Sequence, residues 1–220
     1  MIKAVIFDMD GLLIDTEPHW QRTEREVFSD LGIHITEEMQ VATFGLRSDE
    51  QIRYWFDHKP WKDITFEEVE GRYHDTMLQY FLDQAELMRG AVEALDFFSS
   101  KGLPLALASS SNMQLINAFL DKFAFHHYFT VVYSAEFEEY GKPHPAVYLE
   151  TARRLNTAPV NCLALEDSFH GIIAAKAARM KTIAVPLHPE ARFSASDVVL
   201  NSLTDLNDGV FHQLDQYYKI

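Results

Sequence analysis

The chain has 220 residues, of which 47% are hydrophobic, and it carries a formal net charge of −14 at pH 7. This length and composition suffice for one large domain, or for a core domain with a smaller inserted one. The negative charge argues against nucleic acid or an anionic membrane as a partner, because both bind basic surfaces.

The cellular setting follows from what the sequence lacks. Cys162 is the single cysteine, so no intramolecular disulfide can form, and we expect it to pack in the core. No apolar run approaches the roughly 20 residues of a membrane span. The N-terminus reads as a strand rather than a basic leader. We therefore expect a cytoplasmic protein that works as a monomer.

The first predicted element is a buried strand over residues 2–7, which leads directly into Asp8 and Asp10. Open α/β sheets bind ligands at this end of their strands. Gly11 permits the backbone turn that lets both side chains leave the strand end together. Two adjacent carboxylates repel unless a cation lies between them or one is protonated, so the pair indicates a divalent metal, acid–base chemistry or both. The alternative is an acidic turn without chemistry.

A block of helices is predicted next, because residues 17–88 contain no convincing strand. Hydrophobic spacing predicts a helix over residues 18–31. Two more helices are expected to begin at Ser48 and Thr65, each of which is followed three residues later by Gln or Glu, the spacing of a capping box.

After residue 90, strands and helices alternate. The predicted strands cover residues 103–108, 129–133, 162–165, 182–185 and 198–200. Alternation of this kind predicts an α/β fold with a parallel sheet between helices. We predict that residues 1–15 and 89–220 form this core domain, and that residues 16–88 form an inserted helical domain on two short hinges.

Three other predicted strands lead to polar residues. These are Ser109 with Ser110, Lys142, and Glu166 with Asp167. Because the carboxyl ends of parallel strands share one edge, we expect these groups to converge on Asp8 and Asp10. Each group also has a structural alternative: a helix N-cap for the serines, a solvated loop lysine, and an idle acidic turn.

Taken in order, four motifs resemble those of the haloacid dehalogenase superfamily, specifically its sugar-phosphatase branch, which includes β-phosphoglucomutase and 2-deoxyglucose-6-phosphatase. They are Phe7-Asp8-Met9-Asp10-Gly11, Leu107-Ala108-Ser109-Ser110-Ser111, Gly141-Lys142-Pro143-His144-Pro145 and Leu165-Glu166-Asp167-Ser168. The resemblance covers the whole chain. It implies a Rossmann-like parallel-sheet core, with residues 16–88 as a small α-helical cap.

The resemblance also implies the chemistry of the acidic residues. Asp8 would be the nucleophile that becomes an aspartyl phosphate, and Asp10 would act as the general acid and base. Mg²⁺ would be held by Asp8, the backbone carbonyl of Asp10, and Asp167. Glu166 would either bind the metal directly or contact the residues that bind it.

The phosphate site is implied in the same way. Ser109 and Ser110, with the backbone N–H groups that follow, would bind the phosphate oxygens. Lys142 would balance charge between the phosphate and Asp8. Three nearby histidines, His19, His144 and His170, receive no role.

Two departures from the mutase pattern favour hydrolysis. Trp20 stands where β-phosphoglucomutase has its cap-linker histidine, and Arg47 matches the mutase cap arginine only with a displacement of one residue. The resemblance is closest to 2-deoxyglucose-6-phosphatase, so we predict hydrolysis of a small sugar or sugar-alcohol phosphate, such as 2-deoxyglucose 6-phosphate or a hexitol phosphate. Glu17, Trp20 and Arg47 are predicted to contact substrate from the cap.

Two other functions stay open at this stage. One is a phosphosugar mutase like β-phosphoglucomutase. The other is a phospho-receiver or a non-catalytic binding module, since receivers also place acidic residues beside a phosphorylatable aspartate. The sequence does not name the physiological phosphate ester, because specificity depends on the positions of cap side chains.

Overall fold

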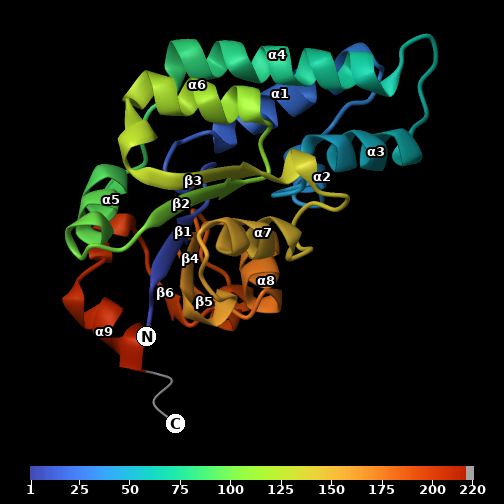
Figure 1. Ribbon diagram of the computed structural model, residues 1–220. Coiled ribbons are helices and arrows are strands. Elements are labelled where there is room, and N and C mark those ends of the chain that lie inside the picture. The colour runs from blue at the N-terminus through green and yellow to red at the C-terminus, as the bar shows by residue number, and fades with distance from the viewer. Residues whose placement is uncertain (217–220) are drawn as a thin grey trace.

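The computed structural model describes residues 1–216 and contains a six-stranded sheet of order β3-β2-β1-β4-β5-β6. The strands are β1 Ala4–Phe7, β2 Leu105–Ser109, β3 Phe129–Ser134, β4 Cys162–Glu166, β5 Lys181–Ala184 and β6 Val198–Val199. All neighbours pair in parallel, as predicted. The chain builds the sheet outward from β1 in one direction and then, from β4, in the other (Figure 1). Ligands of open α/β sheets bind at such a point of reversal.

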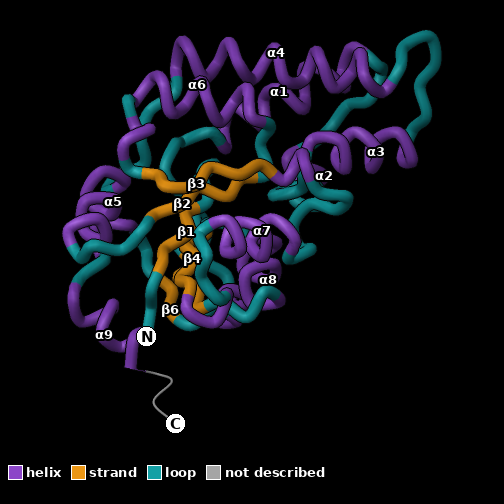
Figure 2. The backbone as a smooth tube through the Cα atoms, in the orientation of Figure 1, coloured by secondary structure: helices purple, strands orange, loops and turns teal. Residues whose placement is uncertain are grey.

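Helices cover both faces of the sheet (Figures 1 and 2). They are α5 Ala91–Ser100, α6 Met113–Phe123 and α9 Asp208–Gln216 on one face, and α7 Ala146–Arg154 and α8 Phe169–Ala177 on the other. Alternate residues of β1 serve the two faces: Val5 and Phe7 pack with the first set, and Ala4 and Ile6 with the second. The prediction of a doubly covered parallel sheet is therefore confirmed.

A block of four helices lies over the carboxyl-terminal edge of the sheet (Figure 1). It consists of α1 Glu17–Asp30, α2 Glu37–Gln40, α3 Ser48–His58 and α4 Phe66–Gln84. Part of its interior is a separate hydrophobic cluster, which contains Phe28, Trp55 and Tyr73. We call this block the cap; its boundaries at residues 16 and 88 stay a prediction.

The two passages between cap and core pair with each other. The backbone N–H of Asp15 donates to the carbonyl of Glu86 at 2.9 Å, and that of Met88 donates to the carbonyl of Leu13 at 2.9 Å. The entry and exit of the cap are thereby joined beside the end of β1.

The helix predicted to begin at Ser48 does begin there, but the structure corrects its predicted capping box. Ser48 is the first residue of α3 and not its N-cap; the cap position belongs to Arg47, whose backbone N–H donates to Glu50 Oε2 at 3.3 Å. The side chain that accepts from the N-cap backbone is therefore that of Glu50, and not that of Gln51 as the predicted capping box required. At Thr65 the predicted capping box is confirmed, because Thr65 and Glu68 exchange hydrogen bonds of 2.8 and 3.2 Å.

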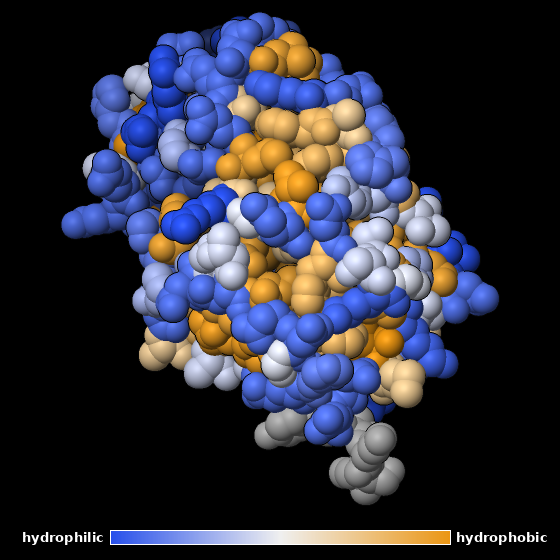
Figure 3. Space-filling view, turned by 90° about the vertical axis from the view of Figure 1, so that its left-hand side faces the viewer, coloured by the Kyte–Doolittle hydropathy of each residue, from blue (hydrophilic) through white to orange (hydrophobic). Residues whose placement is uncertain are grey.

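One face of the surface mixes polar and apolar residues. Figure 3 shows hydrophilic residues over much of one face, with patches of hydrophobic residues between them. Exposed apolar residues of this kind are usual, since polar atoms alone cannot cover a protein. Within residues 1–216, no helix combines the length and apolar composition required to traverse a bilayer.

We predict that Leu163→Ala destabilises the protein by about 2–5 kcal/mol, because Leu163 is fully buried in β4 and the shortened side chain leaves a cavity. Leu149→Ala is the matched control, since Leu149 is 42% exposed on α7. Urea unfolding measures both changes. An equal effect of the two substitutions would contradict the assigned core.

Candidate active site

A buried ammonium group joins three strands at the carboxyl edge of the sheet. Lys142 Nζ lies 2.6 Å from Asp8 Oδ1 and 2.6 Å from Glu166 Oε1, and it donates to the carbonyl oxygen of Ala108 at 3.2 Å. These bonds use all three of its donors. Lys142, Asp8 and Glu166 are 2%, 6% and 0% exposed, so the cluster has little access to solvent. The predicted convergence of distant segments is therefore observed.

The sheet dictates this meeting. Phe7 and Leu165 are in register on the neighbouring strands β1 and β4, so Asp8 and Glu166, the next residues, leave the sheet side by side. Lys142 comes from the loop between β3 and α7 and reaches inward beneath the cap. A solvated loop lysine, the alternative considered for Lys142, is wrong.

Glu166 is held on both carboxylate oxygens. Oε1 accepts from Tyr148 Oη at 2.6 Å as well as from Lys142, and Oε2 accepts from the backbone N–H and hydroxyl of Ser168 at 3.2 and 3.0 Å. A Cβ on Gly171 would lie 1.8 Å from Oε1, so the start of α8 approaches this side chain as closely as glycine allows. Tyr148 and Gly171 were not anticipated from the sequence, where neither lies in a motif.

When all of them are ionised, the acidic residues carry more negative charge than Lys142 neutralises. Burial raises the pKa of Asp8 to about 8 against the opposing effect of Lys142, and the charges of Glu166 and Asp10 add to the rise. Burial, followed by the charges of Glu166 and Asp8, raises the pKa of Asp167 well above its usual range. Burial alone would lower the pKa of Lys142, but the two adjacent carboxylates have the larger combined effect. The pKa of Lys142 is therefore raised above its ordinary value, and the side chain stays charged.

This charge excess fits a divalent cation. Asp8, Glu166 and Asp167 each offer a carboxylate oxygen within 4.8 Å of the others. Among residues 1–216 no side chain or backbone group donates to Asp167, whereas Glu166 is fully engaged. Buried carboxylates with free oxygens are the donors that Mg²⁺ and similar hard ions prefer. Gly11 makes room for the arrangement: its φ is +72°, and a Cβ there would lie 2.1 Å from Asp167 Oδ2.

Asp10 lies beside the cluster and faces hydroxyl and indole donors. Oδ1 accepts from Thr16 Oγ1 at 2.9 Å and from Trp20 Nε1 at 3.0 Å. Oδ2 accepts from Ser109 Oγ at 3.2 Å and from Ser111 Oγ at 2.8 Å. These four donors hold the carboxylate in one orientation. Trp20 uses its N–H to position Asp10 and also lines the pocket, so its predicted contact with substrate stays a prediction.

The serine motif does not cap the following helix. Asn112 is the N-cap of α6, and its Oδ1 accepts from the backbone N–H of Leu115 at 3.0 Å. The capping alternative for the serines is therefore wrong. The hydroxyl of Ser110 lines the pocket, is buried, and has no hydrogen-bond partner among the residues described. It is the free hydroxyl of the motif, since Ser109 is bonded to Asp10.

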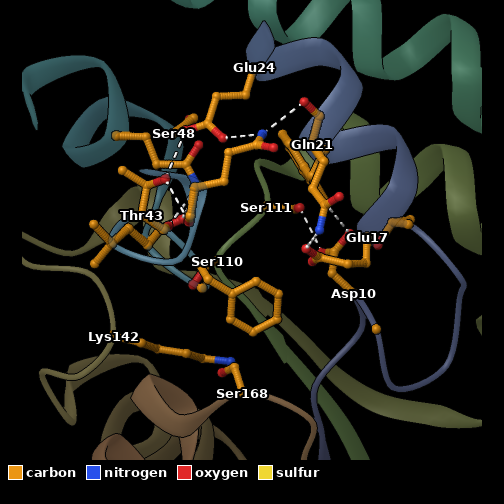
Figure 4. Close-up of a pocket in the computed structure, with 18 of the residues that line it drawn as sticks. Asp10, Glu17, Gln21, Glu24, Thr43, Ser48, Ser110, Ser111, Lys142 and Ser168 are labelled. Carbon is orange, nitrogen blue, oxygen red and sulfur yellow. Dashed lines mark hydrogen bonds between the residues drawn. The ribbon is translucent and has the colours of Figure 1, made fainter. Parts of the chain in front are cut away.

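The cluster opens into a pocket between core and cap. In Figure 4, Lys142 and Ser168 lie on one side of this space, and Gln21, Glu24 and Thr43 lie on the opposite side. The cap side is rich in acceptors: Glu24 is buried and bonded to Gln40, Thr43 and Trp55 at 2.6–2.8 Å. This network was not anticipated from the sequence, because its members are scattered over 32 residues without a motif.

Glu17 lines the same pocket, and its predicted contact with substrate stays a prediction. Burial raises its pKa to about 7, although the hydrogen bond from Gln21 Nε2, at 2.6 Å, opposes the rise. Glu17 therefore changes charge near neutral pH.

Arg47 and His170 lie where cap meets core. Arg47 donates to backbone carbonyls of the core and to Asp49, so its guanidinium is engaged by protein acceptors, and its predicted contact with substrate stays a prediction. A ring nitrogen of His170 lies 2.8 Å from the carbonyl oxygen of Phe44 in the cap. His144, by contrast, is exposed.

Comparison with known proteins identifies the class to which this fold and site belong. The family model described as haloacid dehalogenase-like hydrolase matches residues 5–185, and the chain belongs to that family. Hexitol phosphatase B of Escherichia coli (strain K12) is 42% identical over 210 residues, which cover 93% of this chain and 94% of that protein. A phosphorylated carbohydrates phosphatase of Thermotoga maritima is 33% identical over 187 residues, covering 85% of this chain and 86% of that protein. With these relatives, the chain is a phosphoric monoester hydrolase.

A solved structure extends the likeness in fold. The β-phosphoglucomutase of Clostridium difficile superposes with a TM-score of 0.88 at 23% sequence identity, over 99% of both chains. At this identity the likeness concerns the fold alone. It agrees with a Rossmann-like core that carries a helical cap.

We predict that Asp167→Asn stabilises the metal-free protein, and that the gain is larger at pH 8 than at pH 5. The raised pKa of Asp167 means that folding is favoured at low pH and loses that contribution as pH rises through the folded-state pKa. A gain of about 1 kcal/mol would raise the melting temperature by about 2–4 °C in a chain of this size. Thermal unfolding in the presence of a chelator measures it.

Asp57→Asn, an exposed acid on α3, is the matched control and should change little. Added Mg²⁺ should stabilise the original protein more than Asp167→Asn. A lower melting temperature of metal-free Asp167→Asn at pH 8 would contradict the excess of negative charge.

Proposed function

We propose that the chain is a Mg²⁺-dependent phosphatase that hydrolyses small sugar or sugar-alcohol monophosphates, through a phosphate ester formed transiently on Asp8. One observation carries the proposal: a buried ammonium group and three carboxyl side chains lie together at the floor of a pocket whose opposite wall is polar and acidic. The names of the relatives, a hexitol phosphatase and a phosphatase of phosphorylated carbohydrates, support the same class of substrate.

In the first step, a carboxylate oxygen of Asp8 attacks phosphorus and the bond from phosphorus to the leaving alkoxide breaks. Asp8 Oδ2 suits this role, because Lys142 occupies Oδ1 and nothing in residues 1–216 donates to Oδ2. Asp10 supplies the proton that the alkoxide needs, which requires it to turn from its present donors toward the pocket. The phosphate stays on the enzyme.

In the second step, water attacks the phosphorus of the ester on Asp8. Asp10 accepts the proton that the water loses, and the bond between phosphorus and the Asp8 oxygen breaks, which regenerates the carboxylate and releases phosphate. Splitting one difficult displacement into two easier ones is the benefit of the covalent route.

The phosphate itself would be bound by the serine motif and balanced by Lys142. The hydroxyl of Ser110 has no other partner, and we assign it, with Ser109 and adjacent backbone N–H groups, to the phosphate oxygens. Lys142 balances charge between phosphate and Asp8. Mg²⁺ held by Asp8, the backbone carbonyl of Asp10, and Asp167 would neutralise phosphate charge, with Glu166 orienting Lys142 from behind.

The charges of the pocket favour hydrolysis of monophosphates over mutase chemistry. Among the described residues that line the pocket, Lys142 is the only lysine or arginine. It lies against Asp8, where the phosphate would bind. Burial lowers the pKa of His74, so this residue stays neutral on the cap side. A bisphosphate would bring its second phosphate toward Glu17 and Glu24 without a cation to receive it. A neutral polyol can donate hydroxyl hydrogens to these acceptors instead.

We also propose that the cap, residues 16–88, closes over bound substrate as a lid, and that the enzyme acts as a cytoplasmic monomer without nucleic-acid or membrane partners. The paired passages near Leu13 and Met88 support hinged motion at two adjacent points. The net charge of −14 supports the absence of polyanionic partners.

We predict that Asp8→Asn lowers phosphate release by at least about a thousandfold, because the amide is not a nucleophile toward phosphorus. Asp15→Asn, an exposed acid just before the cap, is the control and should retain activity. Release of inorganic phosphate from p-nitrophenyl phosphate and from a hexitol phosphate, with Mg²⁺ or with chelator, measures the effect. Acid-quenched enzyme should carry phosphate on the peptide that contains Asp8.

Two outcomes would count against this assignment. Near-normal turnover by Asp8→Asn would exclude Asp8 as the nucleophile. Full activity in the presence of excess chelator would exclude the proposed dependence on a divalent metal.

We predict that kcat/KM is at least about tenfold higher for hexitol and 2-deoxyhexose monophosphates than for hexose bisphosphates or phosphoglycolate, a difference of about 1.4 kcal/mol. The preference should grow between pH 6 and pH 8, because the pKa of Glu17 is about 7 and the side chain becomes charged over this range. Glu17→Gln should weaken the preference and its pH dependence.

Glu38→Gln, on the exposed side of α2, is the matched control. A panel of phosphate esters assayed at both pH values gives the comparison. Equal or better use of bisphosphates by the original enzyme would refute the assigned role of the acidic cap wall.

A further inference from the structure

A second set of polar contacts joins cap to core away from the pocket. Arg47 Nη1 donates to the carbonyls of Ala135 and Glu138 at 2.6 and 2.8 Å, and Nη2 donates to that of Glu139 at 3.4 Å. Asp49 accepts from Nε at 2.5 Å and from Nη2 at 2.8 Å. The five N–H groups of the guanidinium are thus all used by protein acceptors.

Glu50 extends this contact along the same core loop. Its Oε1 accepts from the backbone N–H of Gly141 at 2.9 Å. A Cβ on Gly141 would lie 2.6 Å from Glu50 Oε2 and 3.1 Å from the Cβ of Arg47, so cap and loop approach as closely as glycine permits. The next residue is Lys142. We call Arg47, Asp49 and Glu50 the clasp.

The clasp differs from an ordinary surface ion pair. Arg47 is 9% exposed, Ala135 is fully buried, and Gly141 is buried as well. Exposed pairs contribute little, but a planar guanidinium that serves several carbonyls fixes the orientation of the groups it joins. The clasp and its acceptors are 88 or more residues apart in the chain, so these bonds exist only while the cap rests on the core.

The clasp differs from other contacts between cap and core in the segment of the core that it holds. In Figure 1 the loop between β3 and α7 lies against the start of α3. His170 meets the cap at Phe44, near α8, and the passages at Leu13 and Met88 lie beside β1. Of these contacts, the clasp alone holds the segment that carries Lys142.

We propose that the clasp couples closure of the cap to the position of Lys142. When the cap closes, Arg47 and Glu50 bind residues 135–141 and thereby hold the Lys142 ammonium against Asp8. When the cap opens, the loop loses these bonds, and the contact between Lys142 and Asp8 becomes less well ordered. Arg47 and Glu50 are positioning residues that act through Lys142. The inference rests on the proposed phosphatase function, because that activity reports the state of the Lys142–Asp8 pair.

The test compares Arg47→Lys with Arg53→Lys. Lysine at position 47 keeps the charge but cannot serve five acceptor atoms in a planar fork. Arg53 lies in α3, the helix that Arg47 caps. Arg53 is exposed and lies over the ring of Phe66, at 4.3 Å from its centroid. In the described chain it forms no hydrogen bond or ion pair with the core. Steady-state kinetics are measured with p-nitrophenyl phosphate and a hexitol phosphate.

Arg47→Lys should lower kcat about tenfold or more for both esters, while KM changes by less than about threefold. Arg53→Lys should match the original enzyme. Unchanged kcat would overturn the proposal. So would a rise in KM for the hexitol phosphate alone, because that result would mean that Arg47 binds substrate directly.

Hydrogen–deuterium exchange provides a readout that does not depend on turnover. The peptide over residues 135–145 should exchange faster in Arg47→Lys and in Glu50→Ala than in the original protein or in Arg53→Lys, at equal melting temperatures. Glu50→Ala serves as the second variant if Arg47→Lys does not fold. Unchanged exchange in this peptide would overturn the clasp.

The two proposals fail in different ways. If the original protein hydrolyses no ester in the panel, the proposed function is wrong, and exchange at residues 135–145 still decides whether the clasp orders the loop. If the ester panel is hydrolysed but both clasp variants keep normal kcat and normal exchange, the clasp alone is wrong.

Discussion

The site depends on one buried ion cluster, the ammonium of Lys142 between the carboxylates of Asp8 and Glu166. Buried charges are costly unless they are paired and hydrogen-bonded, and Tyr148 and Ser168 complete the bonding of Glu166. Asp167 adds a further carboxyl group without a donor in the described chain. The result is a buried acidic floor whose carboxylate oxygens lie close enough together to hold a divalent cation.

The parallel sheet makes this cluster possible. Strands β1 and β4 are neighbours although they cover residues 4–7 and 162–166, and their register places Asp8 next to Glu166. Lys142 comes from the loop that follows β3, the strand at one edge of the sheet. Groups that would repel each other in a flexible chain are held together because the surrounding hydrophobic layers stabilise the sheet as a whole. Sites of this kind trade local stability for chemistry.

The proposed choice of substrate rests on the residues of the cap. A mutase with the same fold superposes over nearly the whole chain, so the architecture does not by itself distinguish a mutase from a hydrolase. The acidic groups Glu17 and Glu24 and the absence of a second cation among the described lining residues favour a neutral, hydroxyl-rich leaving group. Arg47, which could have supplied a cation to the pocket, instead fastens the cap to the loop of Lys142.

The sequence alone determined the α/β class, the helical insertion and the meeting of four motifs, because buried strands have a recognisable apolar pattern and parallel strands share one edge. Only the tertiary structure decided the partners of Arg47, Trp20 and Glu166 and revealed the network around Glu24. These hydrogen bonds join side chains from separate helices and loops, and whether a donor reaches substrate or a backbone carbonyl depends on displacements of about an ångström, which local sequence patterns do not encode.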